Sequence, residues 1–274
     1  MLSLSTLARM TTDFTGTTAL ITGASSGLGA EFAIAFARRG ADVVLVARRE
    51  ERLRELAERI EREHGVRAMP IALDLARPDA HTALRAALDD RGIRIQTLVN
   101  NAGFGVKGAF AESDPVRIAE MVQLNVASLV AITREFLPDL VADGRGALVN
   151  VASVAAYQPC PDMAVYGASK SFVLSFTEAL AYETRASSLR VLAVSPGATS
   201  TEFFDVVGTR DAAVGRFQTP EQVVALALRR LDQRRPPASV VSGRANALTS
   251  TLVRFMPRSL ALAVSGRVLA EPAR

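Results

Sequence analysis

The sequence predicts an α/β fold in which a parallel sheet is doubly wound, with helices on both of its faces. Short apolar segments of strand length alternate with longer segments whose apolar residues recur at helical spacing. The apolar segments lack the alternation of half-exposed strands, as expected when helices cover both faces of a sheet. The first apolar segment runs into a glycine-rich loop and a helix. In this fold, ligands bind beyond the carboxyl ends of the strands.

Each strand is predicted from a run of apolar residues. These runs lie, in order, at 17–22, 42–47, 68–73, 97–100, 147–151, 190–194 and 238–241. The clearest is the run from Val43 to Val46, in which no polar residue interrupts the apolar side chains. The run at 17–22 ends at glycines, which allow the chain to turn sharply where the strand stops.

The helices are predicted between the strands from apolar residues three or four positions apart. They lie, in order, at 27–39, 50–63, 78–91, 114–143, 166–187 and 220–234. Leu53, Leu56 and Ile60 form one apolar stripe on a segment that otherwise alternates Arg with Glu. Because right-handed crossovers join parallel strands, few topologies remain for this order of elements.

A single folded domain is expected. The chain has 274 residues, of which 49% are hydrophobic, and no repeat or low-complexity run interrupts it before about residue 235. Length alone would allow one or two domains, but the continuous alternation favours one. We therefore predict an N-terminal extension at 1–14, one α/β domain at 15–242 and a basic amphipathic tail at 243–274. Translation could start at Met1 or at Met10.

Composition argues against several classes of partner. The net charge is +4, but the arginines are spread along helices with glutamates and no interleaved aromatic residues, so nucleic acid is not an expected partner. Cys160, His64 and His81 are the only cysteine and histidines, so neither an internal disulfide nor a metal site is predicted. No long N-terminal apolar segment and no uncharged run of ~20 apolar residues is present. We expect a cytoplasmic protein.

The glycine-rich loop predicts a site for a pyrophosphate. It follows the first strand and consists of Thr22, Gly23, Ala24, Ser25, Ser26, Gly27, Leu28 and Gly29. Glycines let the backbone approach a dinucleotide closely, and the following helix directs its free N–H groups and dipole at the anion. An ordinary tight turn is the alternative. The loop also fits the G-x-S-x-G pattern of hydrolases, but both histidines precede residue 82, whereas that triad needs a late histidine.

Tyr166 and Lys170 form a candidate acid/base pair. They lie four residues apart at the start of a predicted helix and therefore share one face. A nearby ammonium group favours tyrosinate, so we predict a lowered pKa for Tyr166 and proton exchange near neutral pH. The alternative is an amphipathic pair on the surface.

These segments together resemble the single-domain branch of the short-chain dehydrogenase/reductase family. The resemblance covers about residues 15–245 and depends on several motifs in the same order. The motifs are Thr22-Gly23-x-x-x-Gly27-x-Gly29, Asp74, Asn100-Asn101-Ala102-Gly103, Asn125, Ser153, Tyr166-x-x-x-Lys170, and Pro196-Gly197 followed by Thr199 and Thr201. With the alternation above, the resemblance implies a seven-stranded sheet in the order 3-2-1-4-5-6-7.

The resemblance also implies roles for these residues. Tyr166 would exchange the proton at the substrate oxygen, Ser153 would hydrogen-bond that oxygen, and Asn125 would hold a water molecule near Lys170. Lys170 would lower the pKa of Tyr166 and bind the ribose of the nicotinamide half. The implied catalytic residues are Ser153, Tyr166, Lys170 and Asn125. The implied cofactor-binding residues are Thr22, Gly23, Ser25, Ser26, Gly27, Leu28, Gly29, Arg48, Asp74, Leu75, Asn101, Ala102, Gly103, Tyr166, Lys170, Pro196, Gly197, Thr199 and Thr201. Asn125, Ser153 and the Asn100-Asn101 pair also have structural alternatives, as a core amide, a helix cap and a turn.

The residues after the second strand predict NADP(H) as the cofactor in preference to NAD(H). An NAD enzyme usually places an acidic residue there to bind the ribose 2′-OH. Here Ala47 precedes Arg48, and a guanidinium can pair with a 2′-phosphate. The alternative is that Arg48 and Arg49 are the solvated start of the next helix. The glycine loop contains no basic residue, so Arg48 is expected to carry most of the discrimination between NADP(H) and NAD(H).

The resulting functional hypothesis is hydride transfer between a nicotinamide and a carbonyl or alcohol. The second hypothesis is a catalytically silent NADP-binding regulator or scaffold of the same fold. We expect a hydrophobic substrate against Ala155, Tyr157, Met163 and a short lid at 201–217. The broad apolar surface of the helix at 114–143 predicts a homodimer or homotetramer. The alternative is that both apolar faces of this helix are buried within one monomer. The tail is predicted to pack on the domain or on a second copy, with peripheral contact to a membrane as the alternative.

Overall fold

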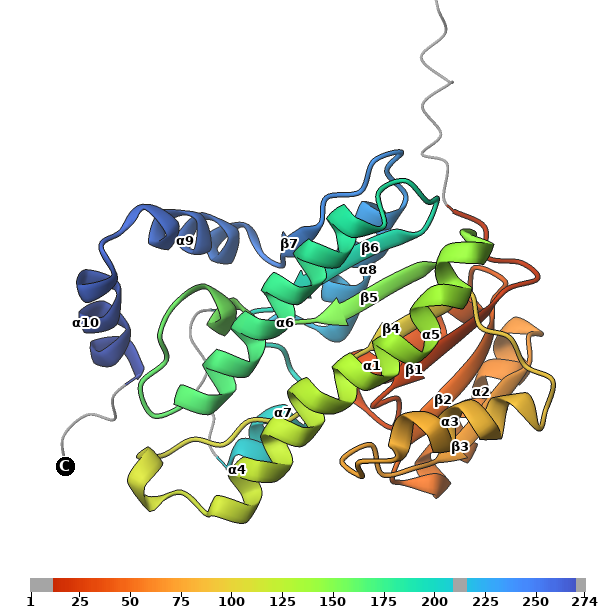
Figure 1. Cartoon of the computed structure of the whole chain (residues 1–274), viewed down its shortest axis with the longest axis horizontal. Coiled ribbons are helices and arrows are strands. Elements are labelled where there is room, and N and C mark those ends of the chain that lie inside the picture. Colours follow the sequence, from red (N-terminus) through yellow and green to blue (C-terminus); the bar gives the residue numbers. More distant parts are fainter. Residues whose placement is uncertain (1–11, 209–215, 270–274) are drawn as a thin grey trace, which may run out of the picture.

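The computed structural model of the chain describes residues 12–208 and 216–269. Most of the predicted N-terminal extension, part of the predicted lid and the last tail residues lie outside these ranges. A parallel sheet of seven strands forms the centre, in the order β3-β2-β1-β4-β5-β6-β7, which confirms the predicted fold and strand order (Figure 1). The strands are β1 Thr18–Thr22, β2 Asp42–Ala47, β3 Ala68–Ala72, β4 Thr97–Asn100, β5 Ala147–Val151, β6 Arg190–Ser195 and β7 Ser239–Val241.

Helices cover both faces of the sheet. The long helices of the domain are α1 Gly27–Ala37, α2 Glu50–His64, α3 Ala80–Asp89, α4 Pro115–Val122, α5 Leu129–Asp143, α6 Ala164–Glu183 and α8 Pro220–Leu231. Helices α1, α2 and α8 pack on one face, in a core that includes Ile21 and Leu45. Helices α3, α5 and α6 pack on the other face, against Leu20 and Val44, and α5 and α6 cross in front of the sheet in Figure 1. The alternate residues of each strand therefore supply two separate cores.

The helix predicted at 114–143 forms as one helical run, Pro115–Asp143, with a π-helical turn inside it that the sequence did not predict. Helix α4 starts after Asp114, whose side chain accepts a hydrogen bond from the N–H of Val116. A π-helical turn at Gln123–Ser128 separates α4 from α5. Wider turns of this kind occur often at functional sites, and this one contains buried Asn125. By length and composition the run 115–143 could cross a membrane. Ile132, Phe136 and Leu140 of this run lie in the hydrophobic core.

The described part of the tail forms two helices, α9 Arg244–Phe255 and α10 Arg258–Leu269. Pro257 separates them, because the residue before a proline is disfavoured in the helical conformation and Met256 is extended. Both helices lie at the opposite end of the molecule from α2 and β3 (Figure 1). Several apolar side chains of the pair are exposed, including Phe255 at 83%.

Candidate active site

A cavity of about 630 Å³ lies at the carboxyl ends of the strands, where the fold predicts a ligand site. It runs from the glycine loop after β1, past the loops after β2 and β4, to the first turns of α6. Eighteen of the predicted site residues line it, namely Gly23, Ser25, Ser26, Gly27, Leu28, Arg48, Asp74, Leu75, Asn101, Ala102, Gly103, Ser153, Tyr166, Lys170, Pro196, Gly197, Thr199 and Thr201. Thr22, Gly29 and Asn125 lie behind this wall.

The residues behind the wall hold the loops that form it. Thr22 Oγ1 accepts hydrogen bonds from the N–H groups of Asn101 (2.9 Å) and Ala102 (3.0 Å), which ties the loop after β4 to β1. The Asn101 side chain donates in return to the carbonyl oxygen of Thr22 at 2.9 Å. A Cβ at Gly29 would overlap the carbonyl oxygen of Gly23, so only glycine allows the tight turn. Thr22 and Gly29 therefore position the loop residues that face the cavity.

Asn125 braces the loop after β4 from the π-helical turn. Its Oδ1 accepts from the N–H of Phe104 at 3.1 Å, and its Nδ2 donates to the carbonyl oxygen of Phe104 at 2.9 Å. The same Nδ2 donates to Ser169 Oγ at 3.1 Å, which connects this loop to α6. Asn100 does not line the cavity. Its side chain donates to Asn150 on β5 and to Thr133 on α5. Asn125 Oδ1 and Lys170 Nζ both lie beside Gly103, so Asn125 is close to the end of the cavity that holds Lys170.

Ser153, Tyr166 and Lys170 come together at one end of the cavity. Ser153 caps a short 3-10 helix, η3 Val154–Tyr157, and its Oγ accepts from the N–H of Ala155 at 3.1 Å. Tyr166 and Lys170 lie on the first turns of α6, where both are buried. Lys170 Nζ donates to the carbonyl oxygen of Val151 at 2.8 Å and lies 6.0 Å from the centre of the Tyr166 ring. The four-residue spacing predicts that Tyr166 and Lys170 share one face of α6. Both residues line the cavity, where a ligand can reach them.

The electrostatics of this group differ from the sequence prediction. Burial raises the pKa of Tyr166 to about 12, whereas a hydrogen bond with Ser153 acts in the opposite direction. Burial also lowers the pKa of Lys170, to about 8, because an ammonium group loses solvation there. The predicted lowering of the Tyr166 pKa by Lys170 is thus wrong for the protein by itself. Desolvation of the buried hydroxyl is the largest cause of the raised Tyr166 pKa, and the Lys170 ammonium group is directed at the carbonyl oxygen of Val151.

The segment after β6 forms the opposite wall. Thr201 packs on the glycine loop, since a Cβ at Gly27 would lie 2.9 Å from its Cγ2. A short helix, α7 Phe203–Val207, follows, and the ring centre of Phe203 lies 5.4 Å from that of Tyr166. The described part of the predicted lid is therefore in contact with both ends of the cavity.

The substrate end of the cavity is mainly apolar. Ala155 and Met163 line it as predicted, together with Phe104, Phe203 and Val206. Tyr157 is not part of this wall; its hydroxyl accepts from Ser195 Oγ at 3.5 Å. Cys160 is buried in the wall, and burial raises the pKa of its thiol to about 11. The thiol is thus a wall residue with little thiolate character.

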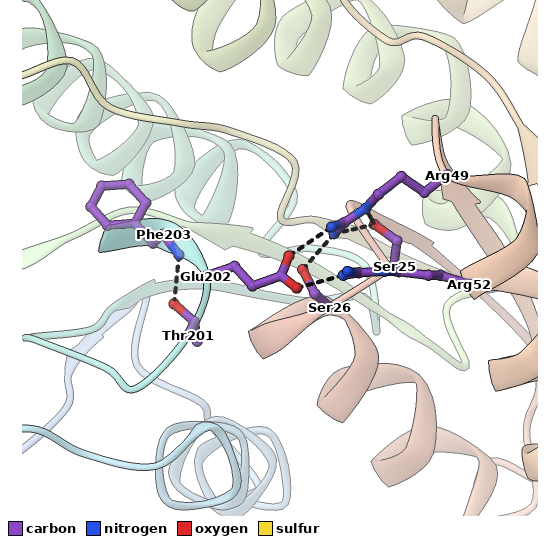
Figure 2. Close-up of polar contacts among 7 residues, drawn as sticks. All are labelled: Ser25, Ser26, Arg49, Arg52, Thr201, Glu202 and Phe203. Atoms are coloured by element: carbon purple, nitrogen blue, oxygen red, sulfur yellow. Dashed lines mark hydrogen bonds and ion pairs between the residues drawn. The ribbon is translucent and has the colours of Figure 1, made fainter. Parts of the chain in front are cut away.

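The lining residues that were not predicted include two groups that bear on the site. The first is on α9, which contributes Ala245, Asn246, Thr249 and Ser250 from the tail. No local pattern signals this contact, because it depends on where the tail folds back. The second is Arg49, which donates through Nε and Nη2 to Ser25 Oγ (3.2 and 2.9 Å) and through Nη2 to Ser26 Oγ at 2.8 Å. Figure 2 shows its guanidinium against the glycine loop.

Arg48 and Arg49 thus share the position that the sequence assigned to Arg48 alone. Arg48 is exposed and lines the cavity. Discrimination between NADP(H) and NAD(H) was assigned mainly to Arg48, but Arg49 brings a second guanidinium to the same rim. Both arginines are visible in the sequence, but sequence alone does not show that the Arg49 side chain turns toward the glycine loop.

Comparisons with known proteins agree with this geometry. The short chain dehydrogenase family profile matches residues 17–211. Sulfoacetaldehyde reductase 2 of Chromohalobacter salexigens is 41% identical over 188 residues, which are 67% of this chain and 73% of that protein.

Two solved structures add a bound cofactor to this likeness. A short-chain dehydrogenase from Sphingobium yanoikuyae in complex with NADPH has a TM-score of 0.75 and 36% identity, and covers 88% of this chain and 94% of its own. L-sorbose reductase of Gluconobacter frateurii, complexed with NADPH and L-sorbose, has a TM-score of 0.74 and 30% identity, over 85% of this chain and 98% of its own. The chain therefore belongs to the short-chain dehydrogenase/reductase family of oxidoreductases.

Proposed function

We propose that this protein is an NADP(H)-dependent oxidoreductase that interconverts a hydrophobic carbonyl compound and its alcohol. One observation carries the proposal: a single cavity joins Ser153, Tyr166 and Lys170 at one end to Arg48, Arg49 and the glycine loop at the other. A dinucleotide needs a site of this form, with a phosphate-binding rim and a reactive end. The relatives bound to NADPH support this choice of cofactor.

The residues fit a nicotinamide cofactor, which would supply or accept the hydride when bound. Tyr166, with its raised pKa, holds a proton at neutral pH and can give it to the oxygen of a carbonyl substrate. Ser153, beside it, can hydrogen-bond the same oxygen and stabilise the charge that develops there. The Lys170 ammonium group favours the tyrosinate that forms when the proton leaves.

The wall chemistry supports a hydrophobic substrate. Phe104, Met163, Phe203 and Val206 surround the space next to Tyr166. The described residues that could meet a charged substrate there are few: Arg117 lies over the Phe104 ring at 4.4 Å and pairs with Glu120 at 2.8 Å. An anionic group on the substrate would have to compete with Glu120. An uncharged ketone or aldehyde with an apolar body meets no such competition.

Cofactor oxidation with a panel of ketones and aldehydes tests this function. The purified protein should consume NADPH with at least one hydrophobic carbonyl compound and do so faster than with NADH. NADPH binding without turnover across a broad panel would favour the silent regulator instead.

The reductive rate should depend on pH through Lys170. Because the pKa of Lys170 is lowered to about 8, its charge is present below that pH and is lost above it. Tyr166 keeps its proton throughout, since its pKa is raised to about 12. We expect kcat/KM for carbonyl reduction to be level below pH 8 and to fall above it. A profile that stays level or rises through this range would contradict the assignment.

An oligomer is also proposed. Helices α4 and α6 expose large apolar side chains, including Val116 at 63%, Val122 at 42% and Phe172 at 41%. Apolar side chains exposed to this extent on neighbouring helices are typical of a surface that packs against another protein chain. Light scattering at micromolar concentration should give the mass of a dimer or a tetramer. A monomeric mass would overturn the proposal.

A further inference from the structure

Glu202 connects the segment after β6 to the rim of the cofactor cavity. It directly precedes α7, and its carboxylate lies between two arginines (Figure 2). Arg49 Nη1 donates to Glu202 Oε2 at 2.7 Å, and Arg52 Nη1 donates to Glu202 Oε1 at 2.5 Å. The two arginines come from the start of α2 and the residue before it, far from Glu202 in sequence. This ion-paired group, Glu202 with Arg49 and Arg52, is called the Glu202 clasp below.

The clasp contains a built site for an anion. Arg49 is fixed on the hydroxyls of Ser25 and Ser26, so its guanidinium is already oriented. Glu202 uses the remaining nitrogen, and the paired arginines hold the pKa of Glu202 down to about 2. The carboxylate is therefore ionised at every physiological pH. A negative group thus occupies the place where two guanidinium groups and two hydroxyls meet.

This place coincides with the end of the cavity where a 2′-phosphate would lie. Arg48, Arg49, Ser25, Ser26 and Glu202 all line that rim. A phosphate carries about −1.5 to −2 charge at neutral pH and accepts through three oxygens, whereas a carboxylate carries one charge. The two anions would repel each other at one guanidinium. The side chains of Arg49 and Glu202 are 44% and 40% exposed, so exchange with a ligand is sterically open.

We propose that Glu202 is an internal competitor for the 2′-phosphate of NADP(H), and that this phosphate displaces it and frees α7 from the glycine loop. NAD(H) has no such phosphate and would leave the Glu202 clasp closed. The inference rests on the proposed function, because it requires that NADP(H) be the ligand of this rim. It goes further in assigning Glu202, Arg49 and Arg52 to cofactor choice.

Displacement of Glu202 would also affect the wall of the cavity next to Tyr166. Phe203 follows Glu202 directly, and its ring lies against that of Tyr166 at 5.4 Å. Its N–H donates to Thr201 Oγ1 at 3.3 Å, which links the residues on the two sides of Glu202 (Figure 2). The identity of the cofactor would thereby change the wall that the substrate meets.

Cofactor titration of the Glu202→Gln variant tests the competition. Binding of NADPH and of NADH is followed by the fluorescence of each reduced cofactor, with the full-length protein. Loss of a charge-assisted competitor should tighten NADPH binding by on the order of 10-fold and leave NADH binding within about twofold of wild type. Asp205→Asn is the matched control, since Asp205 is an exposed carboxylate on α7 outside the clasp; it should change neither affinity.

Other outcomes have distinct meanings. Weaker NADPH binding by Glu202→Gln would show that the clasp persists in the complex, and unchanged binding would show that Glu202 does not compete; either overturns the inference. If wild type binds NADH more tightly than NADPH, the proposed cofactor fails instead.

Hydrogen exchange of α7 provides a second readout. In wild type, the α7 amides should exchange faster with saturating NADPH than with saturating NADH. In Glu202→Gln this difference should disappear, because no carboxylate ties α7 to Arg49 and Arg52. Equal exchange with both cofactors in wild type would contradict release of α7.

Discussion

Replacement of Tyr166 by phenylalanine is expected to lower kcat for carbonyl reduction by about 10²–10⁴-fold, the usual contribution of general acid/base catalysis. The substitution keeps the ring, which packs in an apolar cluster with Met121, Cys160 and Met163, and removes only the hydroxyl. Folding and NADPH affinity should therefore stay near wild type. Steady-state kinetics with the best substrate of the panel, together with cofactor titration, measures both.

Tyr182→Phe is the matched control for this change. Tyr182 lies on the same helix, α6, but is 67% exposed and far along the helix from the cavity. Its replacement should leave kcat unchanged. Full turnover by Tyr166→Phe would mean that another group supplies the proton.

Arg48→Asp is expected to shift cofactor preference from NADP(H) toward NAD(H). A charge-assisted hydrogen bond contributes roughly 1.5–3 kcal/mol, so the ratio of kcat/KM values should change on the order of 10–150-fold. The new carboxylate would repel a 2′-phosphate and could accept a hydrogen bond from a ribose 2′-OH. Because Arg49 stays on Ser25 and Ser26, residual NADPH binding is expected.

Arg54→Asp controls for the change in net charge. Arg54 is 65% exposed on α2 and pairs with Glu50, away from the residues that line the cavity. Its variant should keep the wild-type ratio. An unchanged ratio in Arg48→Asp would remove Arg48 from cofactor discrimination.

The fold was predictable because its signals are local and repeat along the chain. Unbroken apolar runs such as Val43 to Val46 mark strands that are buried on both faces, and the strand order followed from alternation and family resemblance. The spacing of Tyr166 and Lys170 likewise placed both on one face of α6. These predictions use only neighbours in sequence and general rules of packing.

The remaining features depend on tertiary contacts and on burial. The π-helical turn at Gln123–Ser128 contains no glycine or proline from which it could have been predicted. Glu202 meets Arg49 and Arg52 across about 150 residues of sequence, and α9 reaches the cavity only because the tail folds back. The Tyr166 pKa shifts upward because its hydroxyl is buried, and sequence spacing does not report desolvation.

Direct detection of hydride transfer tests the central claim, that this cavity carries NADP(H)-dependent reduction with Tyr166 as proton donor. The wild-type protein is incubated with NADPH deuterated at both C4 positions and with a hydrophobic ketone, and the alcohol is analysed by mass spectrometry. We predict one deuterium on the carbinol carbon of the product, with little labelled alcohol formed by Tyr166→Phe in the same time. Bound cofactor with no labelled alcohol from any carbonyl compound, or equal labelling by Tyr166→Phe, would contradict the account.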